Sequence, residues 1–115
     1  MTPSEELAII TECLEEHKAE DIVSVDLKGS SPFADYAVIA TCPNPRALGA
    51  LQEHVEDALA ENEVVVKVKE GEPDSGWVIV QGEDVIVHLM LAGNRRMLDL
   101  ETLLEQLKQR NSPRD

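Results

Sequence analysis

The feature that most constrains the fold of this chain is a candidate β-hairpin that spans residues 77–90. Two runs rich in Val and Ile, 77–80 and 85–90, flank the polar link Gln-Gly-Glu-Asp at 81–84. A short polar link that contains glycine between two such runs is typical of a β-hairpin. Since an isolated hairpin is only marginally stable in water, the remaining residues must provide further strands and helices to cover it.

Two helices are predicted from capping residues followed by helical apolar spacing. Thr2 is a candidate N-cap, with Pro3 at the first helical position and Glu5 at the third. Asn44 and Pro45 can begin a second helix in the same way. The apolar residues of the two buried stripes recur three or four positions apart: Leu7, Ile10 and Leu14 in the first helix, and Leu48, Leu51, Val55 and Leu59 in the second.

Three more strands are predicted upstream of the hairpin. Residues 22–27 alternate apolar and polar side chains, which is typical of a strand with one wetter face. Residues 36–41 form a nearly continuous apolar run, which predicts an interior strand. Residues 64–69 end in alternating Val and Lys, which predicts a strand near the sheet edge. Because a helix lies between 36–41 and 64–69, these two strands are expected to run parallel through a crossover.

The C-terminal part is expected to hold one more helix. The Ala-Gly-Asn segment at 92–94 is expected to break the chain, and an amphipathic helix then follows over 97–107. The predicted order is therefore αββαβββα. The fold class is α/β (α+β), with a mixed five-stranded sheet flanked by helices. One domain is expected over 1–110, followed by a polar tail at 111–115.

Charge and composition limit the classes of partner and compartment. The net charge of −13 repels nucleic acid phosphate and anionic lipid, so a basic protein is the expected partner. Cys13 and Cys42 are too few for a disulfide scaffold, and Cys13 is expected to be a small buried side chain. No apolar run approaches the roughly 18 residues of a membrane span. We expect a cytoplasmic protein, from a bacterium or an organelle.

Several motifs occur in an order that resembles one known family. They are Lys18-Ala19-Glu20-Asp21-Ile22-Val23 with Asp26, Phe33-Ala34-Asp35-Tyr36-Ala37-Val38-Ile39-Ala40-Thr41, Trp77-Val78, Asp84-Val85-Ile86-Val87-His88 and Asp99-Leu100-Glu101. With these motifs the chain resembles the Iojap-like proteins, called ribosomal silencing factors in bacteria. The resemblance implies a nucleotidyltransferase-like topology without known catalysis or cofactor. It also implies docking on large-subunit ribosomal protein fourteen, which blocks joining of the small subunit and lowers translation.

The resemblance carries over to individual positions only where the residues match. The candidate partner-binding residues are Asp35, Tyr36, Trp77, Asp84, His88, Arg95 and Glu101. The chain departs from the family pattern where Cys42-Pro43-Asn44-Pro45 replaces the usual Gly and Ser, at Ala47 and Gln81, and at aromatic positions filled by Met90, Met97, Leu98 and Leu104.

Each candidate residue also has a purely structural interpretation. Trp77 is either an apolar anchor for a partner or half-buried packing at a strand start. Tyr36 either contacts a partner or caps the core with its hydroxyl in water. His88 follows a buried-looking run, which favours a hydrogen-bonded structural histidine. His17 and His54 are expected to be isolated on helices, and since no metal-binding spacing occurs, no metal site is predicted.

Other functions compete with ribosome binding through protein fourteen. The topology suggests a metal-dependent nucleotidyltransferase, for which Asp35 and Asp84 would be the carboxylate pair, but no Asp-x-Asp follows a Gly-Ser loop. Direct ribosomal RNA binding would need a local basic patch from Lys67, Lys69 and the Arg95-Arg96 pair. A ribosome assembly factor is a further alternative. A sheet edge without a neighbour would also allow a homodimer.

Overall fold

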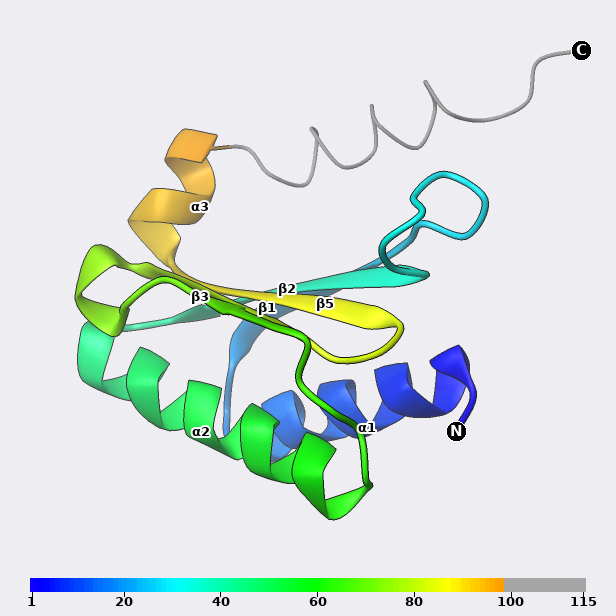
Figure 1. Cartoon of the computed structure of the whole chain (residues 1–115). Helices are drawn as coiled ribbons and strands as arrows, with labels where there is room; N and C mark the ends of the chain where they lie inside the picture. Colours follow the sequence, from blue (N-terminus) through cyan, green and yellow to red (C-terminus); the bar gives the residue numbers. More distant parts are fainter. Residues whose placement is uncertain (99–115) are drawn as a thin grey trace, which may run out of the picture.

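The computed structural model describes residues 1–98, and its elements follow the predicted order αββαβββα (Figure 1). The helices are α1 (Pro3–Glu16), α2 (Pro45–Glu61) and α3 (Ala92–Leu98), the strands are β1 (Glu20–Asp26), β2 (Tyr36–Cys42), β3 (Val68–Glu70), β4 (Trp77–Gln81) and β5 (Val85–Leu91), and a 3-10 turn η1 (Pro73–Ser75) lies between β3 and β4. The predicted capping box forms, because Thr2 Oγ1 accepts from the Glu5 amide at 3.2 Å and Glu5 Oε1 accepts from the Thr2 amide at 2.9 Å. Within these residues, no helix combines the length and the apolar character that crossing a bilayer requires.

The strands form one mixed five-stranded sheet in the order β1-β2-β5-β4-β3, which confirms the predicted fold class. β2 and β5 pair in parallel, and the other neighbours pair antiparallel. The hairpin is confirmed as β4 and β5, with the Gly82 amide donating to the Val85 carbonyl at 3.0 Å across the turn. β2 is an interior strand, as its apolar run predicts. β3 runs parallel to β2 but at the far edge, with β5 and β4 between them.

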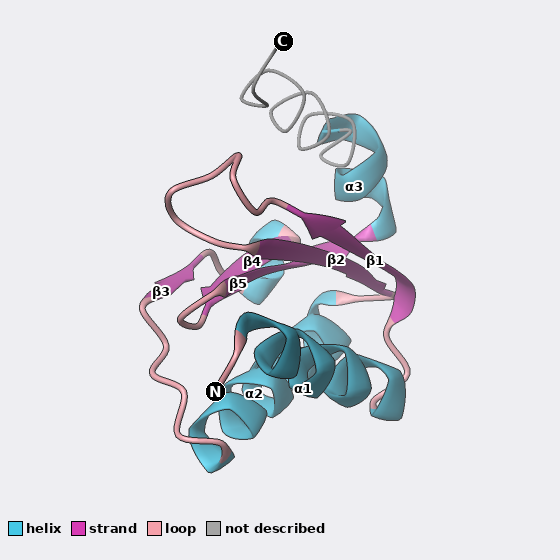
Figure 2. Ribbon diagram, turned by 90° about the vertical axis from the view of Figure 1, so that its right-hand side faces the viewer, coloured by secondary structure: helices cyan, strands magenta, loops and turns pink. Residues whose placement is uncertain are grey.

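The two long helices cover one face of the sheet, and α3 lies on the other (Figures 1 and 2). The main core fills the space between α1, α2 and the sheet. It combines the helical stripes with every second strand residue, among them Ile10, Leu14, Leu48, Val55, Leu59, Val38, Ala40, Val78, Val80, Val85, Val87 and Leu89. This alternation follows from the period of two in a strand. The opposite side chains, including Ile39, Trp77 and Met90, form a smaller cluster on the face that carries α3.

The strand predicted at 64–69 is shorter and later than the sequence pattern indicates. Only Val68–Glu70 pairs with β4, although the Lys67 amide already donates to the Gln81 carbonyl at 2.8 Å. Val64 is 4% exposed and packs in the main core beside the helices. The segment before β3 is therefore still crossing from the helical layer to the sheet, where Val64 and Val66 pack against the main core and Val65 is exposed.

The predicted break at 92–94 is wrong, because α3 begins at Ala92 directly after β5. The Leu91 amide donates to the Gly76 carbonyl at 3.0 Å, and Asn94 Nδ2 donates to the Ser75 carbonyl at 3.2 Å. These contacts with the η1 turn fix the first turn of α3, and Gly93 is not among the described glycines with positive φ. The predicted helical residues 99–107 and the polar tail at 111–115 lie outside the described residues.

Candidate partner-binding surface

The structure separates the predicted partner-binding residues into two groups at opposite ends of the sheet. Asp35 and Asp84 precede the parallel strands β2 and β5, whereas Trp77 pairs with Met90 near the far end of β5. At about 3.3 Å of rise per residue, roughly 20 Å of strand separates the two positions. We call them the hairpin end, with Asp35 and Asp84, and the Trp77 end. Glu101 lies outside the described residues.

At the Trp77 end, Trp77 and His88 form a hydrogen-bonded pair on the face that carries α3. The indole Nε1 donates to His88 Nδ1 at 3.1 Å, and the ring centroids are 5.8 Å apart. His88 is 6% exposed, and burial lowers the pKa of its imidazole to about 4. Since Nδ1 accepts a hydrogen bond, the neutral ring carries its proton on Nε2. The predicted hydrogen bond of a buried His88 is confirmed, and its contact with a partner stays a prediction.

A hollow beside Trp77, here called the Trp77 hollow, has a volume of about 400 Å³. It is lined by Glu70, Gly71, Ser75, Trp77, Ile79 and Asn94. Its shape depends on Gly71, which has a φ of +88°, and a Cβ there would lie 2.2 Å from the Trp77 carbonyl oxygen. Half-buried Trp77 and Ile79 make an apolar wall, and Glu70 supplies a negative charge. The hollow therefore suits a Lys or Arg side chain whose aliphatic stem packs on the indole.

Arg95 has a structural contact at the same end. Its guanidinium Nη1 donates to the Asp21 carbonyl at 2.5 Å, which ties α3 to the start of β1. Asp21 itself has a φ of +49° in the irregular part of β1, where the pairing register with β2 shifts. Arg95 thus holds α3 against the sheet and helps to shape the Trp77 end.

At the hairpin end, backbone contacts fix the loop that leads into β2. The Asp84 carbonyl accepts from the amides of Asp35 at 2.8 Å and Tyr36 at 3.2 Å, and Gln81 Nε2 donates to the Phe33 carbonyl at 2.8 Å. Phe33 is 78% exposed. An ordered loop therefore presents an aromatic ring to solvent. Phe33 is not among the partner-binding residues predicted from the sequence. Its position as the one Phe of an aromatic-poor chain, within a polar loop, could have indicated an exposed contact residue.

Tyr36 closes the edge of the core at this end. Its ring packs against the main core, and Lys28 Nζ donates to its hydroxyl at 2.9 Å. That hydrogen bond lowers the pKa of the Tyr36 hydroxyl. Lys28 also lies 3.8 Å from the Asp26 carboxylate. The structure therefore agrees with the core-capping interpretation of Tyr36.

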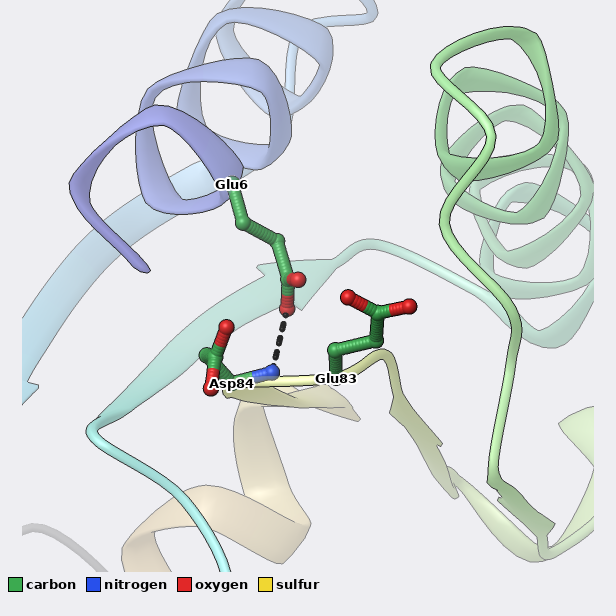
Figure 3. A group of neighbouring side chains, drawn as sticks. All are labelled: Glu6, Glu83 and Asp84. Atoms are coloured by element: carbon green, nitrogen blue, oxygen red, sulfur yellow. Dashed lines mark hydrogen bonds between the residues drawn. The ribbon is translucent and has the colours of Figure 1, made fainter. Parts of the chain in front are cut away.

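A buried carboxylate from α1 supports the hairpin turn (Figure 3). Glu6 is 1% exposed, and its Oε2 accepts from the amides of Asp84 at 3.0 Å and Val85 at 2.7 Å. Carboxylate oxygens of Glu6, Glu83 and Asp84 lie within 4.8 Å of one another. Because the Glu6 carboxylate already accepts hydrogen bonds from two backbone amides of the turn, its role is to hold the turn in place. Within residues 1–95, the carboxylates grouped with Asp84 in this way are those of Glu6 and Glu83 rather than Asp35, which was the partner suggested for an enzymatic pair.

The two helix-borne histidines are not isolated in space, contrary to the prediction. His17 ends α1 and His54 lies in α2, and their rings stack with centroids 3.6 Å apart and planes 5° apart. The packing of α1 against α2 brings them together, which no local sequence spacing could reveal.

Comparison with known proteins identifies the family. The family model described as "Ribosomal silencing factor during starvation" matches residues 1–115. This chain belongs to the ribosomal silencing factor family. The predicted Iojap-like resemblance is thereby confirmed, and with it a role connected to translation.

Relatives and solved structures support this family over most of the chain. The ribosomal silencing factor RsfS of Bacillus subtilis is 33% identical over 97 residues, which are 84% of this chain and 82% of that protein. RsfS of Chromobacterium violaceum is 34% identical over 92 residues, 80% of this chain and 75% of that one. A crystal structure of a Chromobacterium violaceum protein superposes with a TM-score of 0.87 at 31% identity, covering 91% of this chain and 88% of that chain. One from Bacillus halodurans has a TM-score of 0.78 at 26% identity, covering 87% and 93%.

Proposed function

We propose that this protein binds the large ribosomal subunit through ribosomal protein fourteen and sterically blocks joining of the small subunit in the cytoplasm. Membership of the ribosomal silencing factor family is the observation that carries the proposal. Such inhibition requires affinity and position rather than catalysis. The net charge of −13 supports a basic protein partner, since complementary charge speeds encounter and disfavours wrong partners.

The Trp77 hollow is the proposed docking point. Trp and Arg are enriched among residues that dominate binding energy, and a Trp held in place loses little freedom on binding. The hydrogen bond to His88 fixes the indole before any partner arrives. A Lys or Arg of the basic partner would pack its stem on Trp77 and place its charge near Glu70.

The hairpin end is a second candidate contact with different chemistry. Exposed Phe33 would insert into an apolar pocket of the partner, and Asp35 and Asp84 would face basic side chains around that pocket. Because the hairpin end and the Trp77 end lie at opposite ends of the sheet, a variant at each end can assign the contact.

We expect Trp77→Ala to weaken binding to isolated large subunits by about 30-fold, the effect of losing a contact of about 2 kcal/mol. Phe33→Ser is the matched aromatic control at the hairpin end and should bind within a few-fold of the parent, about the effect expected of a peripheral contact. Fluorescence anisotropy of a labelled protein gives both affinities, and circular dichroism verifies that each variant is folded. Parent-like binding by a folded Trp77→Ala, with loss in Phe33→Ser, would move the docking point to the hairpin end.

Binding to purified ribosomal protein fourteen tests the partner itself. We expect a saturable complex that weakens as salt rises, with no comparable binding to naked ribosomal RNA. A complex with RNA alone, steeply dependent on salt, would instead favour the RNA-binding alternative.

A further inference from the structure

A groove lies between α2 and the segment that joins β3 to β4, and we call it the α2–η1 groove. Its volume is about 860 Å³. Side chains within residues 45–56 of α2 line one side, and Lys69 with residues 71–74 lines the other. The two sides approach closely where α2 has a glycine, because a Cβ at Gly49 would lie 3.3 Å from Pro73 Cγ. The groove therefore lies at the border of the sheet, where α2 meets the end of β3.

The α2–η1 groove adjoins a free edge of the sheet. In the part of the chain that the structure describes, β3 is the last strand, so no strand lies beyond its outer edge (Figure 2). Backbone amides and carbonyls on such an edge can pair with an extended segment of another chain. Val65, just before β3, is 67% exposed and adds one apolar side chain to this edge. The edge and the groove together offer backbone and side-chain contacts to one added strand.

Acidic side chains predominate in the α2–η1 groove. Its charged lining consists of four carboxylates and two basic side chains: Glu53, Glu56, Glu72, Asp74, Arg46 and Lys69. Lys69 Nζ lies 2.9 Å from Glu56 Oε1. This hydrogen bond raises the pKa of the ammonium, and the charges of Glu53 and Glu72 raise it further. The groove thus already stabilises one ammonium of this chain. Since two basic side chains cannot neutralise four carboxylates, it favours further cationic groups.

We propose that the α2–η1 groove and the outer edge of β3 bind an extended basic segment of a partner protein, whose Lys or Arg side chains enter the groove. Charge selects this occupant, because a second copy of this chain or a nucleic acid would bring further negative charge. The groove lies next to the Trp77 hollow, since Gly71 lines both. A segment bound here therefore continues the proposed docking surface. The inference rests on the proposed function for the identity of the partner, whereas the chemistry of the groove can be tested without ribosomes.

Titration of the isotope-labelled full chain with a basic peptide, followed by two-dimensional NMR, tests this proposal. The probe is an acetylated and amidated peptide of about eight residues in which Arg and Thr alternate, since Thr favours strands and alternate side chains share one face. We expect saturable binding, with the largest shift changes in β3 and at residues 71–74.

Two variants with the same change in charge test the role of the groove. Glu53→Gln/Glu72→Gln should weaken peptide binding about fivefold, the effect of losing two exposed ion pairs. Glu15→Gln/Glu16→Gln is the matched control, because both residues are exposed on α1 and neither lines the groove. Its affinity should stay within about twofold of the parent, since distant surface charges are screened by salt. Circular dichroism verifies that each variant is folded.

A second peptide, in which Pro replaces each Thr, separates strand addition from general charge attraction. It keeps the charge but removes every second backbone N–H, so we expect binding about tenfold weaker. Equal binding of the two peptides, shift changes centred on another acidic face, or no binding would overturn the proposal. So would parent-like affinity of the folded Glu53→Gln/Glu72→Gln variant.

The peptide assay contains no ribosome, so its failure can be distinguished from failure of the proposed function. Binding to large subunits without peptide binding would reject the α2–η1 groove alone. Peptide binding at β3 without binding to large subunits would reject the proposed function and leave the groove as a site for another basic protein.

Discussion

Replacement of Glu6 by alanine is expected to lower the free energy of unfolding by about 3 kcal/mol, because two amides lose a charged acceptor in a buried setting. Glu6 is 1% exposed and bonds the amides of Asp84 and Val85 at 3.0 and 2.7 Å. The loss should concentrate at the β4–β5 turn and at the start of β2, whose Asp35 amide depends on the Asp84 carbonyl.

Urea unfolding followed by circular dichroism measures this loss. Glu6→Gln keeps one acceptor oxygen and should lose only about half as much, since a neutral hydrogen bond is roughly half as strong as a charge-assisted one. Glu15→Ala, at an exposed position on the same helix, should change stability by about 0.5 kcal/mol or less. If Glu6→Ala were as stable as Glu15→Ala, the carboxylate would not be supporting the turn.

Acidification is expected to destabilise the protein through His88. The folded pKa of about 4 lies below the ordinary value of 6.5, so the unfolded chain takes up the proton first. The contribution of His88 to the free energy of unfolding is therefore complete above pH 6.5 and is lost as the pH falls toward 4. At about 1.4 kcal/mol per pKa unit, the full loss is about 3 kcal/mol. Protonation at Nδ1 would also remove the acceptor for the Trp77 indole.

The variant His88→Gln separates this effect from the titration of the many carboxylates. Glutamine cannot titrate, and its Oε1 can still accept from the Trp77 indole. The difference in unfolding free energy between parent and variant should fall by about 3 kcal/mol between pH 7 and pH 4. A difference that does not change with pH would show that His88 titrates normally in the folded protein. The Trp77 fluorescence gives a second, local readout of the same transition.

Much of the fold was predictable because its signals are local. The caps at Thr2 and Asn44, the Gly-containing turn of the hairpin and the apolar run of β2 each determine an element within a few residues. The two errors, at the start of β3 and at the start of α3, arise where tertiary contacts rather than local sequence determine the boundary of the element. Val64 has the side chain typical of a strand residue, but it packs in the core under the helices. Helix α3 starts at Ala92 because the hydrogen bond from Asn94 to Ser75 of the η1 turn holds its first turn.

The candidate site was predictable only in part. Once the hairpin turn is placed, Trp77 and His88 become diagonal neighbours on one face of the sheet, so their contact follows from the register. Glu6 was not singled out from the sequence, although it precedes Ile10 by about one helical turn and therefore lies on the buried face of α1. The stacking of His17 on His54 depends on how α1 packs on α2, for which 37 residues of separation give no local signal.

The most direct test of the proposed function is sedimentation with separated large and small ribosomal subunits at two salt concentrations, followed by a subunit-joining assay. We expect the protein to co-sediment with the large subunit alone, less strongly at the higher salt concentration, and to reduce the amount of joined ribosomes in proportion to its occupancy. Binding to neither subunit, or binding to the large subunit with joining unaffected, would contradict steric silencing by this protein.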